Sequence, residues 1–402
     1  MYSKLTDIAA NDIEHIIENE ESIDKAIEKM DKIEKKIRFK AFGKTKSKRI
    51  KKINTDKVID DEELLKKQND LIEKNIMEII NGNQNKVTNI FRMRKKIMGK
   101  NMIGASTIQD HVNNELMVTK EDIKTAILNY CKDNLKKNEY NDNSLDYFTD
   151  RNKKVVEILD NMNDDYDITF ENFLNILKKF EKKDTKTYDF LIKAGSMYKF
   201  AFYKLCERII KKEQIPTNFN LTMLHMIWKG KGQMNVLKNQ RFLHMKNVLF
   251  RTVDALNIGI MKQKIVDGCS KFQIGSIPEH SSDEHLIVIK NILANLEIRD
   301  MGFIFLSADI ISFFDKEEVE DCIISLNKLN VNRKAIRIWS KMSDNTLIKV
   351  RTSVGETGTC QIGKVVAQGT TSAAIISAAN LDVSLNELFN NKFEVIKYGN
   401  KR

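Results

Sequence analysis

The stretch FIFLSADIISFFDKEEVED, residues 303–321, joins an uncharged apolar run to a densely charged one. Its first part, Phe303 to Ala308, has the continuous apolar character of a strand buried on both faces. Such strands often present functional groups at their carboxyl ends, which is where Asp309 lies. A carboxylate there is costly unless it meets a cation, and a divalent metal is one such cation. Asp309 is therefore a candidate metal ligand, and the alternative is an aspartate that caps the next turn.

The second acid of this stretch, Asp315, has a different setting. It precedes KEEVEDCIISLNKL, in which apolar residues recur at helical spacing and Glu318 stands where a capping box places its acid. We therefore expect Asp315 to be the N-cap of a helix rather than a metal ligand.

A second informative stretch is KVVAQGTTSAAIISAANLDVSLNELF, which begins at Lys364. It follows a predicted β-hairpin, LIKVRTSVGETGTCQIGKVV, whose turn we expect at Gly355 to Gly358. Gln368 and Gly369 close the hairpin and open a helix lined with Ala, Ser and Thr. Small residues allow either the close approach of a nucleic-acid strand or a tight helix-packing face, and both interpretations stay open.

The composition fits a globular protein with a polyanionic partner. The 402 residues predict roughly two to three domains. The net charge of +11 favours a nucleic-acid partner. Five widely spaced cysteines without a CxxC pair suggest neither a zinc ribbon nor a disulfide framework, so we expect an intracellular setting, nucleus or cytoplasm. No stretch is apolar enough to predict a signal peptide or a membrane span.

The first 185 residues read as a helical, basic extension without a catalytic constellation. Apolar residues at helical spacing predict one amphipathic helix over residues 12–38. Shorter helices are predicted after a capping box at Thr119 to Asp122 and over Ile168 to Phe180. After the first of these helices, at residues 44–52, the run KTKSKRIKK is either a solvated linker or a phosphate-binding or nuclear-localisation patch, through Lys44, Lys46, Lys48, Arg49, Lys51 and Lys52.

Four blocks in the second half, taken in order, resemble the reverse transcriptases of non-LTR (LINE-like) retrotransposons. ADIISFFD, from Ala308, looks like motif A of that family, and AQGTTS, from Ala367, looks like motif B. IWKGKGQMNVLKNQRFLHMKNVLFR, from Ile227, resembles the fingers segment that carries a Lys and, after an Asn, an Arg. KFQIGSIPEHSSDEHLIVI, from Lys271, resembles the next block.

The resemblance implies an α+β fold with a helical N-terminal extension (1–185), a fingers-like region (186–300) and a partial palm of a right-hand polymerase (301–402). It implies RNA-directed DNA synthesis with an RNA template, a DNA primer, deoxynucleotides and two Mg²⁺ ions, without a membrane. Its implied metal ligands are Asp309, which is also the catalytic carboxylate, and the carbonyl of Ile310.

The family's nucleotide contacts carry over to five residues of this chain. Lys229 and Arg241 would meet the triphosphate, and Phe314 would reject a ribonucleotide's 2′-hydroxyl by its bulk. Gln368 and Gly369 would shape the floor beneath the template and nucleotide. For the two cations the plainer interpretation is an ordinary surface charge.

The chain also departs from the family pattern. Ala373 stands where motif B often has Pro, and Gln240 and Phe242 replace a usual aromatic and Pro. No pair of aspartates, the family's motif C, follows Gln368, so we expect a fragment that is inactive as an isolated chain.

Other functional interpretations stay open. One alternative is a non-enzymatic RNA- or DNA-binding remnant, or part of a split retroelement protein. An RNA-dependent RNA polymerase is disfavoured by the bulk of Phe314. A metal site at His280 and His285 lacks further nearby ligands in the sequence.

Overall fold

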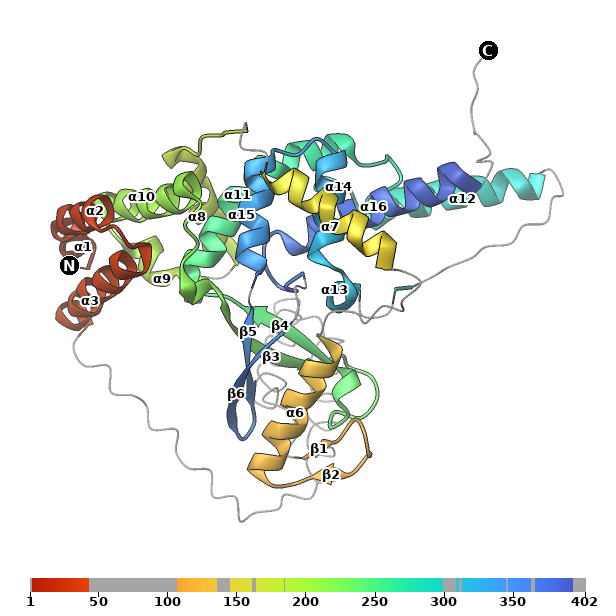
Figure 1. Ribbon diagram of the computed structural model, residues 1–402, viewed down its shortest axis with the longest axis horizontal. Helices are drawn as coiled ribbons and strands as arrows, with labels where there is room; N and C mark the ends of the chain where they lie inside the picture. Colours follow the sequence, from red (N-terminus) through yellow and green to blue (C-terminus); the bar gives the residue numbers. More distant parts are fainter. Residues whose placement is uncertain are drawn as a thin grey trace, which may run out of the picture.

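The computed structural model of the chain describes residues 2–42, 107–135, 145–160, 164–183, 185–298, 309–310, 313–344, 346–362 and 366–392. A bar of helices lies across a smaller lobe built on a β-sheet, which gives a T shape in Figure 1. The predicted α+β class is confirmed. The predicted strand at 303–308 and the basic run at 44–52 lie outside the described residues.

One end of the bar combines helices from the start of the chain with helices that follow residue 168. The first group is α1 (Tyr2–Ile8), α2 (Ala10–Asn19) and α3 (Ile23–Phe42). The second is α8 (Phe170–Lys183), α9 (Thr185–Lys193) and α10 (Ser196–Lys212), and α8 begins close to the predicted position. They share one apolar core, in which Phe173, Tyr188 and Tyr198 are fully buried. Segments on both sides of the expected boundary at residue 185 therefore pack together.

The single helix expected over residues 12–38 is wrong, because the chain breaks between α2 and α3. The guanidinium of Arg208, on α10, donates hydrogen bonds to the carbonyls of Ile17, Glu20 and Glu21 at this break. Carbonyls at a helix end have no intrahelical partner, and a buried arginine that supplies donors to them stabilises the break. The predicted apolar positions of both helices nevertheless face the core, as Ile13, Ile27 and others show.

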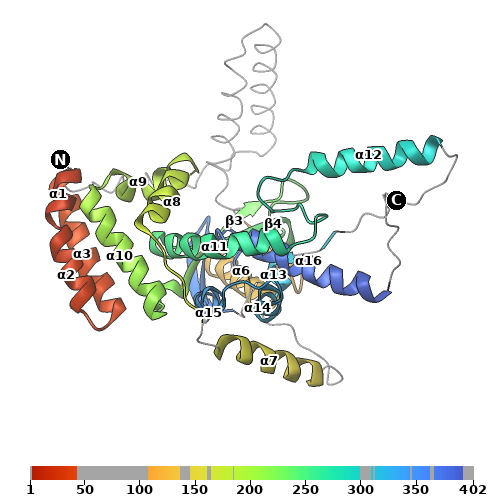
Figure 2. The same cartoon turned by 90° about the horizontal axis from the view of Figure 1, so that it is seen from above.

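The rest of the bar has a second core. It joins α7 (Leu145–Asp160), α11 (Val248–Gly268), α14 (Val319–Lys328), α15 (Arg333–Ser343) and α16 (Ala373–Lys392). The one-turn helix α13 (Phe313–Lys316) lies below α14 in Figure 1. In contrast, α12 (Ser282–Ile298) projects away from the bar in Figure 2 and has no buried residue.

The lobe contains a four-stranded sheet in the order β4-β3-β5-β6. Its strands are β3 (Leu221–Trp228), β4 (Gln240–Met245), β5 (Leu347–Thr352) and β6 (Gly355–Gln361). β3 pairs antiparallel with β4 and parallel with β5, so the long connection through α11–α15 returns the chain to the same sheet. The short hairpin of β1 (Ile108–Gln109) and β2 (Leu116–Met117) lies at the end of this lobe in Figure 1.

Helix α6 (Lys120–Asn134) covers one face of the sheet. The N-cap of its predicted capping box is confirmed, since the Thr119 hydroxyl oxygen accepts a hydrogen bond from the backbone N–H of Asp122 at 3.2 Å. The Asp122 carboxylate accepts from the Thr119 hydroxyl at 2.6 Å. Ile123 and Ile127 of α6 pack with Leu224, Phe242 and alternate residues of the other strands. The opposite face carries partly or fully exposed side chains, among them Ile227 and Arg241.

The predicted hairpin is confirmed as β5 and β6, but its expected turn at Gly355 to Gly358 is wrong. The turn lies at Ser353 and Val354, and Gly355 already belongs to β6. Thr352 fixes this position, because its hydroxyl accepts from the backbone N–H of Val354 at 3.2 Å and donates to the carbonyl of Gly355 at 2.5 Å. The hydrogen bonds of the Thr352 hydroxyl thus place the turn before Gly355 and set the pairing register of β5 with β6.

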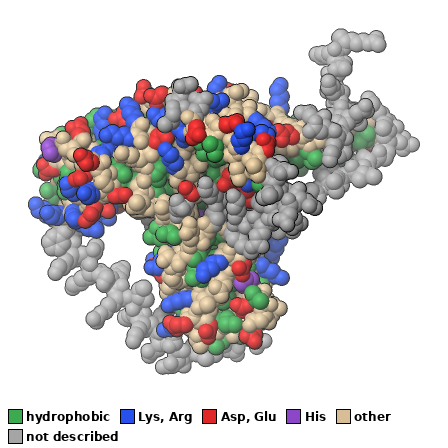
Figure 3. All heavy atoms as spheres, viewed as in Figure 1, with side chains coloured by type: hydrophobic (Ala, Val, Ile, Leu, Met, Phe, Trp, Pro, Cys, Tyr) green, Lys and Arg blue, Asp and Glu red, His purple; other side chains and the backbone are tan. Residues whose placement is uncertain are grey.

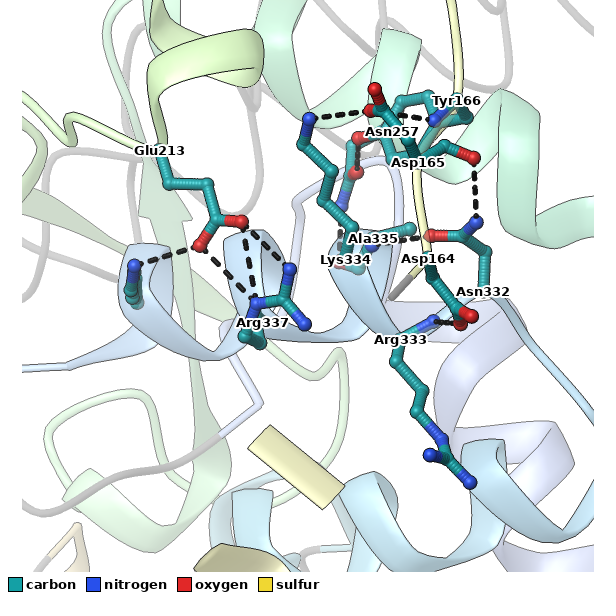
Figure 4. A network of polar contacts seen from close by, with 11 residues as sticks. Asp164, Asp165, Tyr166, Glu213, Asn257, Asn332, Arg333, Lys334, Ala335 and Arg337 are labelled. Atoms are coloured by element: carbon teal, nitrogen blue, oxygen red, sulfur yellow. Dashed lines mark hydrogen bonds and ion pairs between the residues drawn. The ribbon is translucent and has the colours of Figure 1, made fainter. Parts of the chain in front are cut away.

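Helix α15 is attached to its surroundings by the polar network in Figure 4. Asp164 accepts from the backbone N–H of Arg333 at 2.8 Å, and Asp165 pairs with Lys334 at 2.6 Å. Further along the helix, Arg337 forms a forked pair with Glu213, with a shortest distance of 2.8 Å. Both partners of this pair are buried or nearly so.

Candidate functional site

The β3–β4 hairpin carries the two cations predicted to meet a triphosphate. Lys229 follows β3 directly, and Arg241 is the second residue of β4, where it lies opposite Ile227. Both side chains are exposed. The Lys229 backbone N–H donates to the carbonyl of Asn239 at 2.9 Å, and its Nζ donates to the carbonyl of Lys238 at 2.7 Å.

A turn with two glycines joins these strands. Gly230 and Gly232 both have positive φ, +79° and +71°, and a Cβ on Gly232 would lie 2.5 Å from the Asn239 side chain. Glycine is thus required where the loop folds back on itself.

The Gln368–Gly369 turn lies against the outer edge of β4. The backbone N–H of His244 donates to the carbonyl of Gln368 at 2.9 Å, although more than 120 residues separate the two in sequence. Gly369 has φ +106°, and a Cβ there would come within 3.3 Å of the His244 carbonyl oxygen. This close backbone approach explains the glycine. The structure therefore brings Gln368 and Gly369 to the strand that carries Arg241.

A carboxylate that sequence reasoning missed holds the other end of this turn. Asp254, on α11, is almost fully buried and accepts from the backbone N–H of Ser372 at 3.1 Å, at the start of α16. An acid at this point satisfies N–H groups that have no intrahelical partner. Burial raises the pKa of the Asp254 carboxyl, and hydrogen bonds from Ser372 and Thr371 oppose that shift. No local pattern in α11 marks Asp254, because its partner is supplied by a distant segment.

Two further buried polar groups lie beside the turn. Burial and the nearby Lys246 ammonium lower the pKa of His244 to about 3, so its imidazole is neutral at pH 7. Lys246 donates to the carbonyl of Phe219 at 2.7 Å and lies 4.7 Å from the Phe250 ring centroid. Burial lowers the pKa of Lys246 to about 8, against an opposing effect of Asp254.

Phe314 is connected to the same region through α16. Phe314 is half-buried in α13 and packs against the second core, which includes Val366 and Ala373. Just after α13, Glu317 accepts hydrogen bonds from Ser377 and, at 2.9 Å, from Asn380, both on α16. Helix α16 thus links two places: its start is held by Asp254, and its middle contacts the segment that carries Phe314.

The expected N-cap role of Asp315 is wrong. Asp315 lies within α13, and the following helix, α14, begins at Val319 with Glu318 at its N-cap position. Glu318 makes no capping hydrogen bond, because its carboxylate pairs with buried Arg151 on α7 at 2.7 Å. A long-range ion pair has replaced the local cap that the sequence pattern favoured.

Asp309 and Ile310 are both exposed, and no contact in the described structure joins them to the hairpin. An exposed carboxylate has the hard oxygen donors that Mg²⁺ prefers, so Asp309 fits such an ion as one ligand. No group of three or more His, Cys, Asp or Glu that could hold a metal occurs within the described ranges. His280 and His285 take separate partners, Glu284 at 2.8 Å and the Phe272 carbonyl at 3.0 Å.

On the face drawn in Figure 3, Lys and Arg side chains alternate with acidic ones over the helical bar and also occur on the sheet lobe. The basic cluster predicted from Lys44 to Lys52 lies outside the described residues. None of the described helices is both long and apolar enough to cross a membrane. Comparison of the chain with models of protein families and with curated proteins finds no match.

Proposed function

We propose that this chain is the RNA-directed DNA polymerase domain of a non-LTR retroelement, or a part of it. The observation that carries the proposal is the hydrogen bond from the His244 backbone to the Gln368 carbonyl. It joins two blocks that were assigned to one nucleotide site from separate parts of the sequence. A fold unrelated to that site has no need to bring those two blocks together.

Lys229 and Arg241 would bind the triphosphate of the incoming deoxynucleotide. Both side chains are exposed, and Arg241 has no ion-pair partner among the described residues, so its fork of donors is available for a phosphate. The Lys229 ammonium donates a hydrogen bond to the neutral carbonyl of Lys238. No carboxylate of the described residues pairs with its charge.

The Gln368–Gly369 turn would support the template base and the nucleotide opposite it. Its backbone is fixed on one side by β4 and on the other by Asp254, so it can present the Gln368 side chain without a prior rearrangement. Phe314 would stand beside the sugar and reject the 2′-hydroxyl, which makes the product DNA.

Mg²⁺ would supply the charge that stabilises the attacking and leaving oxygens of phosphoryl transfer. The Asp309 carboxylate and the carbonyl of Ile310 would bind the Mg²⁺ ion. Because a metal pair needs further carboxylates, we expect these 402 residues to bind template, primer and nucleotide but to extend a primer poorly.

Nucleotide binding tests the proposal directly. We would measure binding of a fluorescent deoxynucleotide triphosphate to the chain in complex with an RNA–DNA template–primer. We expect Arg241→Ala and Lys229→Ala each to weaken it by roughly tenfold or more, the effect of losing a charged hydrogen bond. The matched control is Lys179→Ala, which removes an exposed cation on α8. Equal effects of all three changes would contradict the proposal.

Sugar selection gives a second readout. Phe314→Ala should reduce the preference for deoxyribonucleotide over ribonucleotide, while overall affinity changes less. If the preference is unchanged, the role assigned to Phe314 is wrong. Binding of template–primer without any nucleotide binding would favour the alternative, a non-enzymatic nucleic-acid-binding remnant.

A further inference from the structure

A polar cleft lies beside the loop between β3 and β4, and Lys229 is not among its lining residues. It has a volume of about 420 Å³, and its walls are the β1–β2 hairpin, helix α6 and the loop between β3 and β4. The backbone N–H of Gln109, in β1, donates to the carbonyl of Asn235 at 3.0 Å. This bond joins the β1–β2 hairpin to the loop between β3 and β4. We call it the amide cleft, after six of its lining residues: His111, Asn114, Tyr130, Gln233, Lys238 and Asn239.

Most of the hydrogen-bonding groups in the amide cleft are neutral. The side chains of Asn114 and Gln233 make no hydrogen bond within the described structure, so each offers an amide donor and a carbonyl acceptor. The Asn239 amide nitrogen is used by the carbonyl of Gln233 at 2.9 Å, which leaves its side-chain oxygen as an acceptor. Donors and acceptors therefore stand side by side around the same space.

An aromatic pair forms another part of the wall. The ring of Tyr130 meets His111 edge to face, with 5.2 Å between centroids, and is stacked on Phe242 at 5.7 Å on the core side. His111 Nε2 is 2.8 Å from the Asp133 carboxylate, so Nε2 carries hydrogen in the neutral tautomer. Its Nδ1 is buried and has no hydrogen-bond partner among the described residues.

We propose that the amide cleft binds a nucleobase, with Lys238 contacting the phosphate attached to it. A planar base can lie against Tyr130 and His111 while Asn and Gln side chains pair with its edge, as in the recognition of unpaired bases by other proteins. The volume is in the range of small-ligand sites, roughly 300 to 1,000 Å³. The Asp110 carboxylate also lines the cleft and accepts hydrogen bonds from the backbone N–H groups of Val112 and Asn113. With one cation, Lys238, and one anion at its wall, the cleft suits a base with a single phosphate better than a triphosphate.

This site is distinct from the proposed triphosphate contacts and does not depend on them. The two share one wall, because Lys229 bonds to the carbonyls of Lys238 and Asn239 in the same loop. The base could belong to a free mononucleotide or to an unpaired position of an RNA strand. The chemistry of recognition is the same in both cases.

Calorimetric titration of the full chain tests the proposal with three probes: the four ribonucleoside monophosphates, unpaired RNA octamers, and blunt duplex RNA. We expect binding of monophosphates or of unpaired octamers in preference to the duplex. If only octamers bind, the source is an RNA strand, and if monophosphates bind equally well, it is the free nucleotide. Failure of both to bind, or equal binding of the duplex, would overturn the proposal.

Variants locate the binding. Lys238→Ala and Gln233→Ala change exposed side chains and should each weaken binding by roughly fivefold or more. The control is Lys231→Ala, an exposed cation of the same loop that does not line the cleft. Tyr130→Leu should weaken binding while Tyr130→Phe keeps the ring and preserves it. If cleft variants and the control bind alike, the cleft is not the site, whatever the result for Lys229 and Arg241.

Discussion

Two arginines of this molecule, Arg337 in the helical bar and Arg241 in the sheet lobe, have opposite surroundings. Arg337 is buried and forks onto Glu213, whereas Arg241 is exposed and has no ion pair among the described residues. A charge removed from water must be paired, so the environment of Arg337 is explained by folding alone. Nothing in folding explains Arg241, and a ligand can therefore use its donors. The comparison separates structural cations from candidate binding cations.

The largest effect is expected from breaking the buried pair. Arg337→Met leaves the Glu213 carboxylate nearly buried with only Lys341 as a partner, at 2.8 Å. Removing one partner of a buried pair costs about 3 to 5 kcal/mol, and Lys341 should place the result at the lower end. Urea unfolding would measure it. The double variant Arg337→Met/Glu213→Gln should be less destabilised than the sum of the single ones, and additive effects would contradict the coupling.

Lys246 is a third case, a buried cation that donates to a backbone carbonyl and has no carboxylate in hydrogen-bonding contact among the described residues. Its folded pKa, about 8, lies below the ordinary 10.5. Between these values the unfolded chain holds more protons, so this group makes stability rise with pH across that window. Relative to Lys246→Met, the wild type should gain on the order of 3 kcal/mol from pH 8 to pH 10.5.

The measurement is the difference between the unfolding free energies of wild type and Lys246→Met at several pH values. Taking the difference removes the titration of other groups, such as the buried tyrosines. Parallel profiles for the two proteins would show that Lys246 is not depressed in the folded state.

A smaller effect is expected at the turn that links the candidate site to β4. Gly369→Ala adds a Cβ at φ +106° and 3.3 Å from the His244 carbonyl oxygen. We expect a loss of about 1 to 3 kcal/mol in unfolding free energy, the range for strained backbone positions. Nucleotide binding should fall as well, because the turn moves relative to Arg241. Gly358→Ala is the control, since a Cβ there meets nothing within 4 Å.

The smallest effect on stability is expected at the exposed cation itself. Arg241→Ala should change the unfolding free energy by no more than about 0.5 kcal/mol, as for most surface substitutions. Its effect on nucleotide binding should be much larger. A destabilisation comparable to that of Arg337→Met would show that Arg241 has a structural partner and would remove the contrast between the two regions.

Most features that depend on neighbouring residues were predicted, although the turn of the β5–β6 hairpin was placed too late in the sequence. The capping box at Thr119 needs only residues three apart, and the hairpin of β5 and β6 is joined by two residues. In these cases the chain supplies both partners of the interaction within a few residues, so the pattern is visible without the fold.

Features that depend on distant partners were missed or misassigned. The break between α2 and α3 is stabilised by Arg208, and Glu318 pairs with Arg151 instead of capping α14. Asp254 accepts from the backbone N–H of Ser372, which lies 118 residues later at the start of α16. In each case a charged side chain satisfies groups of another segment, and the local pattern contains no information about which segment that is.

The α+β class and the local helix and hairpin signals can be read from the amino-acid sequence alone. The candidate residues Lys229, Arg241, Phe314, Gln368 and Gly369 follow from the resemblance of sequence blocks to a known family. The fold brings the Gln368–Gly369 turn against His244 on β4, the strand that also carries Arg241, and Asp254 holds the other end of that turn. Neither contact can be read from local spacing. The tertiary structure also shows which cations form buried ion pairs, such as Arg151 with Glu318 and Arg337 with Glu213. The physical reason is that a backbone hydrogen bond or a buried ion pair depends on the position of both partners in space, whereas sequence spacing fixes that position only within one local element.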